Sequence, residues 1–184
     1  MHVVHSLQQG PWRNISDLLT LNCFMIKESP SVLILDASAF FIAFPVTEKI
    51  MTVPGVVSEL KDIKGKARFE VLTSMGLVVS EPTSQSLKKV KEASIRSGDG
   101  SVLSQTDIEV IALALDVHGT ICSDDFALQN TAQYLDIQIH PLLQKKAEMR
   151  RWLFRCSGCG KYYDLMPVDM TCQICGLEVR RKNK

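Results

Sequence analysis

Short apolar runs alternate along the chain with longer stretches in which apolar residues recur every three or four positions. The run from Val32 to Leu35 is wholly apolar and ends in an acid, Asp36, which is typical of a buried strand in a parallel sheet. Similar runs predict strands at residues 77–80, 119–123 and 137–139. The stretches between them predict helices over residues 37–43, from 53 through 63, and over 66–74, 84–96, 106–115 and 127–134. Strands that alternate with helices predict a parallel-sheet α/β/α sandwich.

The helix after residue 105 carries a start signal of its own. Thr106-Asp107-Ile108-Glu109 has the form of a capping box, in which the Thr hydroxyl and the Glu carboxylate each accept a backbone N–H of the first turn. We therefore expect the helix to begin at Thr106 and Asp107 to lie in its first turn.

The patterning divides the chain into four parts. Residues 1–30 are weakly patterned and predict an N-terminal extension, residues 31–143 the α/β domain, residues 144–153 a charged linker, and residues 154–184 a small cysteine-rich module with a basic tail. No apolar run approaches the roughly eighteen residues that a membrane helix needs, and the first residues lack the features of a signal peptide. We therefore expect a cytoplasmic location and no membrane partner.

Four of the six cysteines fall within twenty residues, as two C-x2-C pairs separated by twelve residues. This spacing is typical of a structural zinc site in which four thiolates surround one Zn²⁺ and leave no open position. Gly160 and Gly176 each follow a pair, where a positive φ lets backbone N–H groups turn toward the sulfurs. Two disulfides are the alternative, which a cytoplasmic location disfavours. The predicted zinc ligands are Cys156, Cys159, Cys172 and Cys175.

The net charge of +1 conceals a division of charge along the chain. Residues 145–184 hold ten Lys and Arg against four Asp and Glu, whereas residues 1–144 hold eleven against sixteen. An acidic body with a basic end predicts an anionic partner for that end.

Several acids occupy positions that a parallel sheet would bring together. Asp36 follows the first strand, Glu59 lies in an apolar helix, Asp107 begins a helix, and Asp124 or Asp125 follows a later strand. Clustered carboxylates repel one another unless a cation joins them, and their oxygens suit Mg²⁺ or Mn²⁺. Singly, each acid also has a structural explanation, as a helix cap or a solvent-facing residue.

These acids and their neighbours resemble the motifs of PIN-domain nucleases over residues 31–141. The matching pieces are Leu33-Ile34-Leu35-Asp36-Ala37-Ser38, Val53-Pro54 with Glu59-Leu60, Thr106-Asp107-Ile108 with Ala112-Leu113-Ala114, and Ser123-Asp124-Asp125. The family's last motif favours Asp125 over Asp124 as the metal ligand, with Ser123 as its hydroxyl neighbour. Apart from the resemblance, Ser38 is expected to hydrogen-bond Asp36, although a Ser at the start of a helix also has a structural explanation. The resemblance implies that Asp36, Glu59, Asp107 and Asp125 hold one or two metal ions.

A PIN domain followed by a four-cysteine ribbon resembles the Nob family of ribosome-biogenesis endonucleases in its compact archaeal form. The resemblance implies hydrolysis of the small-subunit (16S) rRNA precursor at its mature 3′ end, leaving 3′-hydroxyl and 5′-phosphate ends. The partner would then be pre-rRNA in the small-subunit precursor. Residues 1–30 fall outside the resemblance.

Basic and aromatic residues alternate around the ribbon. Cations neutralise phosphates and aromatic faces stack on unpaired bases, so this composition predicts contact with single-stranded RNA. The alternative is that Trp152 and Phe154 pack the ribbon's core and the last residues form a solvated tail. The predicted RNA-binding residues are Arg150, Arg151, Arg155, Lys161, Tyr162, Arg180 and Arg181.

Three other functions compete with this prediction. A toxin-like PIN ribonuclease would act on another RNA but is not expected to carry a ribbon. A non-catalytic RNA-binding assembly factor would keep the fold, although a degraded site would normally have lost an acid. A zinc-dependent redox protein would use its C-x2-C pairs as reactive thiols.

Overall fold

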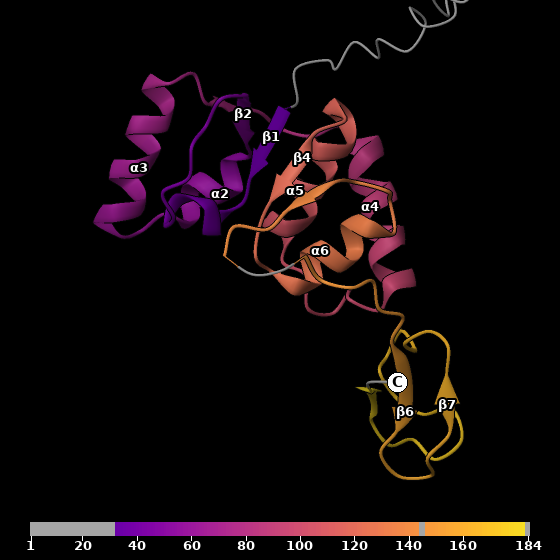
Figure 1. Ribbon diagram of the computed structural model, residues 1–184. Coiled ribbons are helices and arrows are strands. Elements are labelled where there is room, and N and C mark those ends of the chain that lie inside the picture. Colours follow the sequence, from indigo (N-terminus) through magenta and orange to yellow (C-terminus); the bar gives the residue numbers. More distant parts are fainter. Residues whose placement is uncertain (1–31, 144–145, 183–184) are drawn as a thin grey trace, which may run out of the picture.

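The computed structural model describes residues 32–143 and 146–182 (Figure 1). The expected N-terminal extension, residues 1–30, lies outside the described residues, as do residues 31, 144–145 and 183–184.

A five-stranded parallel sheet forms the centre of the larger domain, in the order β3-β2-β1-β4-β5. The strands are β1 (Val32–Leu35), β2 (Lys49–Thr52), β3 (Val78–Val79), β4 (Thr120–Cys122) and β5 (Ile139–His140). β1 is central because it pairs with both β2 and β4, and its last two residues are fully buried. All carboxyl ends therefore lie along one edge, and Asp36 comes to the middle of it.

Helices cover the sheet on both sides, which confirms the predicted α/β/α sandwich. They are the 3-10 helix η2 (Ala37–Phe40), α2 (Pro54–Glu59), α3 (Ile63–Ser74), α4 (Ser84–Ser97), α5 (Gln105–Val117) and α6 (Phe126–Gln133). α4, α5 and α6 pack together, while α3 packs on η2. Figure 1 shows α3 and α4 on opposite sides of the strands. Among the helices that the structure describes, none is long and apolar enough to cross a membrane.

Two expectations about this domain were wrong. Strand β2 was not predicted, because its apolar positions merge with those of the helix that follows. The predicted helix from 53 through 63 ends early, as α2, at Glu59. The next helix, α3, was expected over 66–74 but begins at Ile63, where Asp62 caps it by accepting a hydrogen bond from Gly65 N at 2.9 Å. Glu59 is therefore the last residue of a short helix rather than an interior one.

The capping box of α5 lies two residues earlier than expected. Ser104 is the N-cap: its Oγ accepts Asp107 N at 3.1 Å, and the Asp107 carboxylate accepts Ser104 N at 2.8 Å. Ser-x-x-Asp satisfies both orphan N–H groups with shorter side chains than Thr-x-x-Glu would. Asp107 still lies in the first turn, as predicted.

The cysteine-rich module, called the ribbon below, is a three-stranded antiparallel sheet in the order β7-β6-β8. Its strands are β6 (Leu153–Cys156), β7 (Tyr162–Tyr163) and β8 (Val179–Lys182). Its buried core consists of Phe154, Val179 and two of the cysteines. A core of this size cannot by itself offset the entropy of ordering the chain, which is why such modules need a metal.

Candidate active site and cysteine cluster

Asp36 stands at the carboxyl end of β1 and is only 7% exposed. Its Oδ2 accepts hydrogen bonds from Ser123 Oγ at 2.7 Å and from Ser38 Oγ at 3.1 Å, and its Oδ1 accepts Ala37 N at 2.6 Å. These three donors fix the position of the carboxylate. The predicted pairing of Ser38 with Asp36 is confirmed.

Ser123, directly after β4, connects the ends of two neighbouring strands. It is fully buried, and its Oγ donates to Asp36 while it accepts Asp125 N at 3.0 Å. Its carbonyl accepts Gln129 Nε2 at 2.9 Å. One hydroxyl thus sets the position of Asp36 relative to the backbone of Asp125.

The two adjacent acids after β4 differ in what they contact. Asp124 accepts hydrogen bonds from the backbone N–H groups of Leu142 and Leu143, so it holds the segment after β5. Asp125 is exposed and is the N-cap of α6, where its Oδ1 accepts Leu128 N at 2.8 Å. The negative charge of Asp125 also acts on Asp107. The geometry favours Asp125 as the acid of the site.

The pKa of Asp107 indicates that three of the predicted acids lie close together. Burial raises the pKa of its carboxyl above the usual range, against the lowering effect of its hydrogen bonds with Ser104. The charges of Asp36 and Asp125 raise this pKa further. A bound cation would relieve this repulsion on Asp107, and carboxylate oxygens suit a hard divalent metal.

Glu59 differs from the other three acids. It is exposed at the end of α2 and is not among the charges that raise the pKa of Asp107. Its helix nevertheless lies close to α5, because a Cβ added to Gly55 would come within 2.9 Å of Thr106 Oγ1. The structure therefore brings three acids together and places Glu59 on an adjoining helix.

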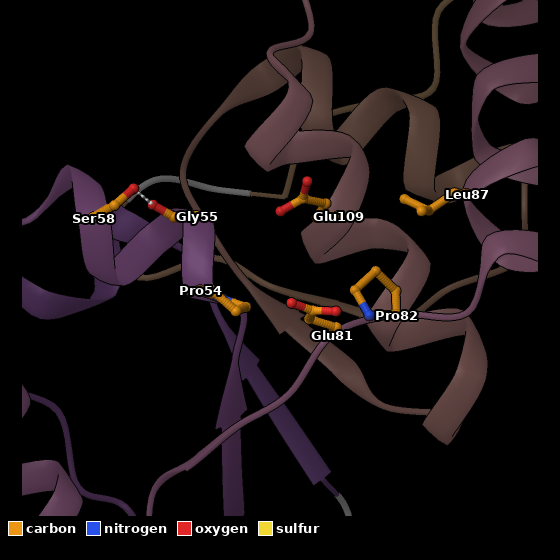
Figure 2. A pocket seen from close by; sticks show the side chains of 7 residues that line it. All are labelled: Pro54, Gly55, Ser58, Glu81, Pro82, Leu87 and Glu109. Atoms are coloured by element: carbon orange, nitrogen blue, oxygen red, sulfur yellow. Dashed lines mark hydrogen bonds between the residues drawn. The ribbon is translucent and has the colours of Figure 1, made fainter.

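Sequence reasoning missed an open cavity of about 540 Å³ beside this edge of the sheet. Figure 2 shows Glu109 of α5 and Glu81, from the segment before α4, on the same side of it, with Ser58 of α2 across from them. Two carboxylates make this cavity acidic, like the site itself. Its residues come from the helices α2, α4 and α5 and from the segment before α4, and they share no sequence spacing that would have revealed the cavity. The lining consists of Pro54, Gly55, Ser58, Glu81, Pro82, Leu87 and Glu109.

The four clustered cysteines converge as predicted, and their four Sγ atoms all lie within 4.8 Å of one another. Two sulfur–sulfur distances run between the C-x2-C pairs: 3.3 Å from Cys156 to Cys175 and 3.5 Å from Cys159 to Cys172. Both are too long for a disulfide bond. A tetrahedron of thiolates around one zinc ion places sulfurs about 3.8 Å apart. The geometry therefore fits one four-coordinate metal ion.

Backbone and side-chain donors surround these sulfurs. Gly158 N donates to Cys156 Sγ at 3.3 Å, and Gly160 and Gly176 have φ of 74° and 71°, as the sequence led us to expect. A hydrogen bond from the Tyr163 hydroxyl lowers the pKa of the Cys172 thiol to about 6. Such donors favour the thiolate form that a metal requires.

The predicted RNA-binding residues fall into two groups. The Arg150 guanidinium lies over the Phe126 ring, Arg155 over Tyr162 and Lys161 over Tyr163. The three basic residues are exposed, as is Tyr162, whereas Phe126 and Tyr163 are half-buried. Arg151 is also exposed, and Arg180 pairs with Glu178 at 2.7 Å.

Arg181 belongs to the other group, because it forms a salt bridge with the buried Asp99 at 2.7 Å. Two of the aromatics also have packing roles. Phe154 is in the ribbon's core and Trp152 stacks with Arg181, which matches the packing alternative for these two aromatics.

The known proteins and the family that this chain is similar to are described as ribonucleases or endonucleases. The family described as "PIN domain of ribonuclease" matches residues 33–117. An endoribonuclease Nob1 of Pyrococcus abyssi is 35% identical over 149 residues, which cover 80% of this chain and 91% of the relative. A ribonuclease VapC1 of Thermoplasma acidophilum is 37% identical over 72% of this chain and 67% of its own length. A 20S-pre-rRNA D-site endonuclease of Schizosaccharomyces pombe is 30% identical over 45% of this chain and 21% of its own length.

Proposed function

The chain belongs to the Nob1 family of endoribonucleases, and from this premise we propose that it cuts the precursor of small-subunit (16S) rRNA to form the mature 3′ end. Support for a pre-rRNA substrate comes from the relative that is named for cleavage of 20S pre-rRNA. The proposal includes a cytoplasmic site of action, where the ribbon thiols stay reduced and available to metal.

One observation carries the catalytic part of the proposal. Asp36, Asp107 and Asp125 meet at the carboxyl edge of the sheet, and the buried hydroxyl of Ser123 joins the first of them to the backbone of the last. In parallel α/β sheets this edge is where ligands bind. We assign these three acids as metal ligands, with Glu59 as the fourth acid, reached from the end of α2. Ser38 and Ser123 position Asp36.

The donor set favours Mg²⁺ or Mn²⁺, one ion or two. Such an ion supplies activation of the attacking water and stabilisation of the charge that develops on the phosphodiester. The chain itself holds the Asp36 carboxylate in place through three hydrogen bonds. The products are 3′-hydroxyl and 5′-phosphate ends.

The ribbon is proposed to hold one structural Zn²⁺ through its four cysteines and to bind RNA. Four thiolates with N–H donors on their sulfurs leave no coordination position for chemistry. The pairs of Arg155 with the exposed Tyr162 and of Lys161 with the half-buried Tyr163 combine a cation with an aromatic ring, the two kinds of group that hold single-stranded RNA. Arg150, Arg151 and Arg180 extend this basic surface.

The test is cleavage of an RNA that spans the 3′ end of small-subunit rRNA, with Mg²⁺ or Mn²⁺ added. We expect one metal-dependent cut by the wild type, none by Asp36→Asn, and full activity in the matched control Asp136→Asn, an exposed acid after α6. Asp125→Asn should abolish the cut and Asp124→Asn should leave metal dependence intact.

Two results would overturn the proposal. Tight binding without cleavage, also in the presence of the precursor particle, would indicate a non-catalytic assembly factor. Cleavage of unrelated RNAs with no preference for the rRNA end would indicate a toxin-like ribonuclease, in line with the similarity to VapC1.

A further inference from the structure

The ribbon is joined to the nuclease domain through a buried carboxylate that none of the catalytic roles uses. Asp99, in the turn after α4, has no exposed surface. Its carboxylate accepts hydrogen bonds from Asn130 Nδ2 at 2.6 Å, Trp152 Nε1 at 3.0 Å and Arg181 Nη1 at 2.7 Å. A buried charge is tolerated only when it is paired and hydrogen-bonded, and here the pairing partner comes from the ribbon's last strand.

Direct packing surrounds this ion pair. The Arg181 guanidinium lies 4.1 Å from the centre of the Trp152 ring, which in turn meets Phe126 edge-on. Gly98 has φ of 84°, and a Cβ there would come within 2.8 Å of Phe154, the core aromatic of the ribbon. The ribbon's own core therefore touches the end of α4.

The segment that leads into the ribbon is also fixed to the nuclease domain. Asn130 of α6 binds both the N–H and the carbonyl of Arg150, at 2.7 and 3.0 Å. Gln129 accepts Ala147 N at 2.9 Å and donates to the carbonyl of Ser123. The described part of the expected linker is thus bound along α6, on the same helix that Asp125 caps.

This attachment places basic residues next to the acidic edge. Arg150 is held by its backbone and lies over Phe126, the residue that follows Asp125 in the chain. An RNA bound along the ribbon would reach Arg150 before it reaches the acids. The distance between the bound RNA and the acids therefore depends on how the ribbon is docked.

We propose that Asp99 is a positioning residue that locks the ribbon onto the nuclease domain and thereby determines which phosphodiester of a bound RNA is cut. The inference rests on the proposed function for its consequence, since a cut is needed to see the effect. The lock itself consists of contacts within the protein, and it can be measured without RNA.

The first arm of the test is ¹⁵N relaxation of the full chain in Asp99→Asn, with Asp136→Asn as the control. Asn keeps the size of the side chain but removes the charge that Arg181 pairs with. We expect one common rotational correlation time for both domains in the wild type and the control, and a shorter one for the ribbon in Asp99→Asn. Equal correlation times in all three proteins would overturn the lock. Trp152→Phe, which keeps an aromatic ring but loses the indole N–H that donates to Asp99, repeats the test if Asp99→Asn folds poorly.

The second arm maps the cleavage positions on two RNAs. On a long RNA that also spans the ribbon, Asp99→Asn should spread cleavage over neighbouring phosphodiesters, so that the fraction cut at the main position falls severalfold. On a short RNA that reaches only the acidic edge, its kcat should equal that of the wild type. A freed ribbon with unchanged cut positions would overturn the proposal. Absence of any cleavage by the wild type would instead count against the proposed function. The relaxation measurement would then still show whether Asp99 holds the ribbon against the nuclease domain.

Discussion

The nuclease domain and the ribbon solve the problem of stability in opposite ways. The first buries more than twenty apolar residues around a parallel sheet, and its site is assembled from strand ends far apart in the sequence. The second buries only four residues, two of which are cysteines of the cluster. In the nuclease domain the packed fold brings the acids of the candidate metal site together. In the ribbon a metal bound by the cysteines is expected to stabilise the fold.

Metal removal should separate the two regions most strongly. Chelation, or Cys156→Ser, should unfold the ribbon, because structural zinc contributes roughly 10–16 kcal/mol to the folding of such modules. NMR signals of residues 153–182 should collapse while those of the parallel sheet persist. Loss of the sheet signals at the same chelator concentration would contradict the independence of the two cores.

A cavity in the sheet domain should have the reverse effect. Ile121, in β4, is fully buried, and Ile121→Ala should lower the free energy of unfolding of this domain by about 2–5 kcal/mol. Denaturation monitored by circular dichroism measures this change. Zinc affinity of the ribbon, titrated with a competing chelator, should stay within the error of the wild type, and a parallel loss there would show that the two regions fold as one unit.

Removal of the hydroxyl that links β1 to β4 should affect the site rather than the fold. Ser123→Ala deletes the 2.7 Å hydrogen bond to Asp36, and such supporting groups typically change metal affinity or activity by about 10–100-fold. Mn²⁺ titration and cleavage rates test this, with Ser74→Ala on the outer face of α3 as the control. Equal metal affinity in both variants would remove Ser123 from the site.

The smallest effect concerns Asp107, whose carboxyl is affected first by burial and then by the charges of Asp36 and Asp125. The pKa of Asp107 is higher in the folded protein than in the unfolded chain. Between these two pKa values the folded protein holds a proton that the unfolded chain has lost. Asp107 therefore makes the metal-free protein less stable as the pH rises from the lower pKa to the higher one. Asp107→Asn should therefore raise the Tm of the metal-free protein slightly at pH 7 and leave it unchanged below pH 3. A lower Tm at pH 7 would mean that the carboxylate contributes more as a cap than it costs by repulsion.

Local signals explain most of what the sequence predicted correctly. The cysteine spacing and the apolar run of β1 are each contained within about twenty residues, and the structure confirms both. The α/β alternation was sufficient to place Asp36 at the carboxyl edge of the sheet. The start of α5 was wrong by two residues because Ser104 and Thr106 both begin an acceptable capping sequence, and only the folded backbone selects between them.

Features that depend on distant partners were not predicted. Arg181 was assigned to RNA binding, but it contacts Asp99, which lies 82 positions away. Asp99 stands between two glycines, a sequence typical of a turn, and nothing nearby marks it as buried. The segment before the ribbon was expected to be a linker, and the amide side chains of α6 that hold it resemble ordinary polar residues in the sequence.

Three of the four candidate acids also begin helices: Asp36 caps η2, Asp107 completes the capping box of α5, and Asp125 caps α6. Selection for folding therefore retains them even in a lineage that no longer needs cleavage, because replacing a cap with Ala costs about 0.5–2 kcal/mol. Glu59 ends a helix instead of beginning one. In the evolutionary record of this family, drift at the position of Glu59 would be the earliest mark of a nuclease turning into a scaffold.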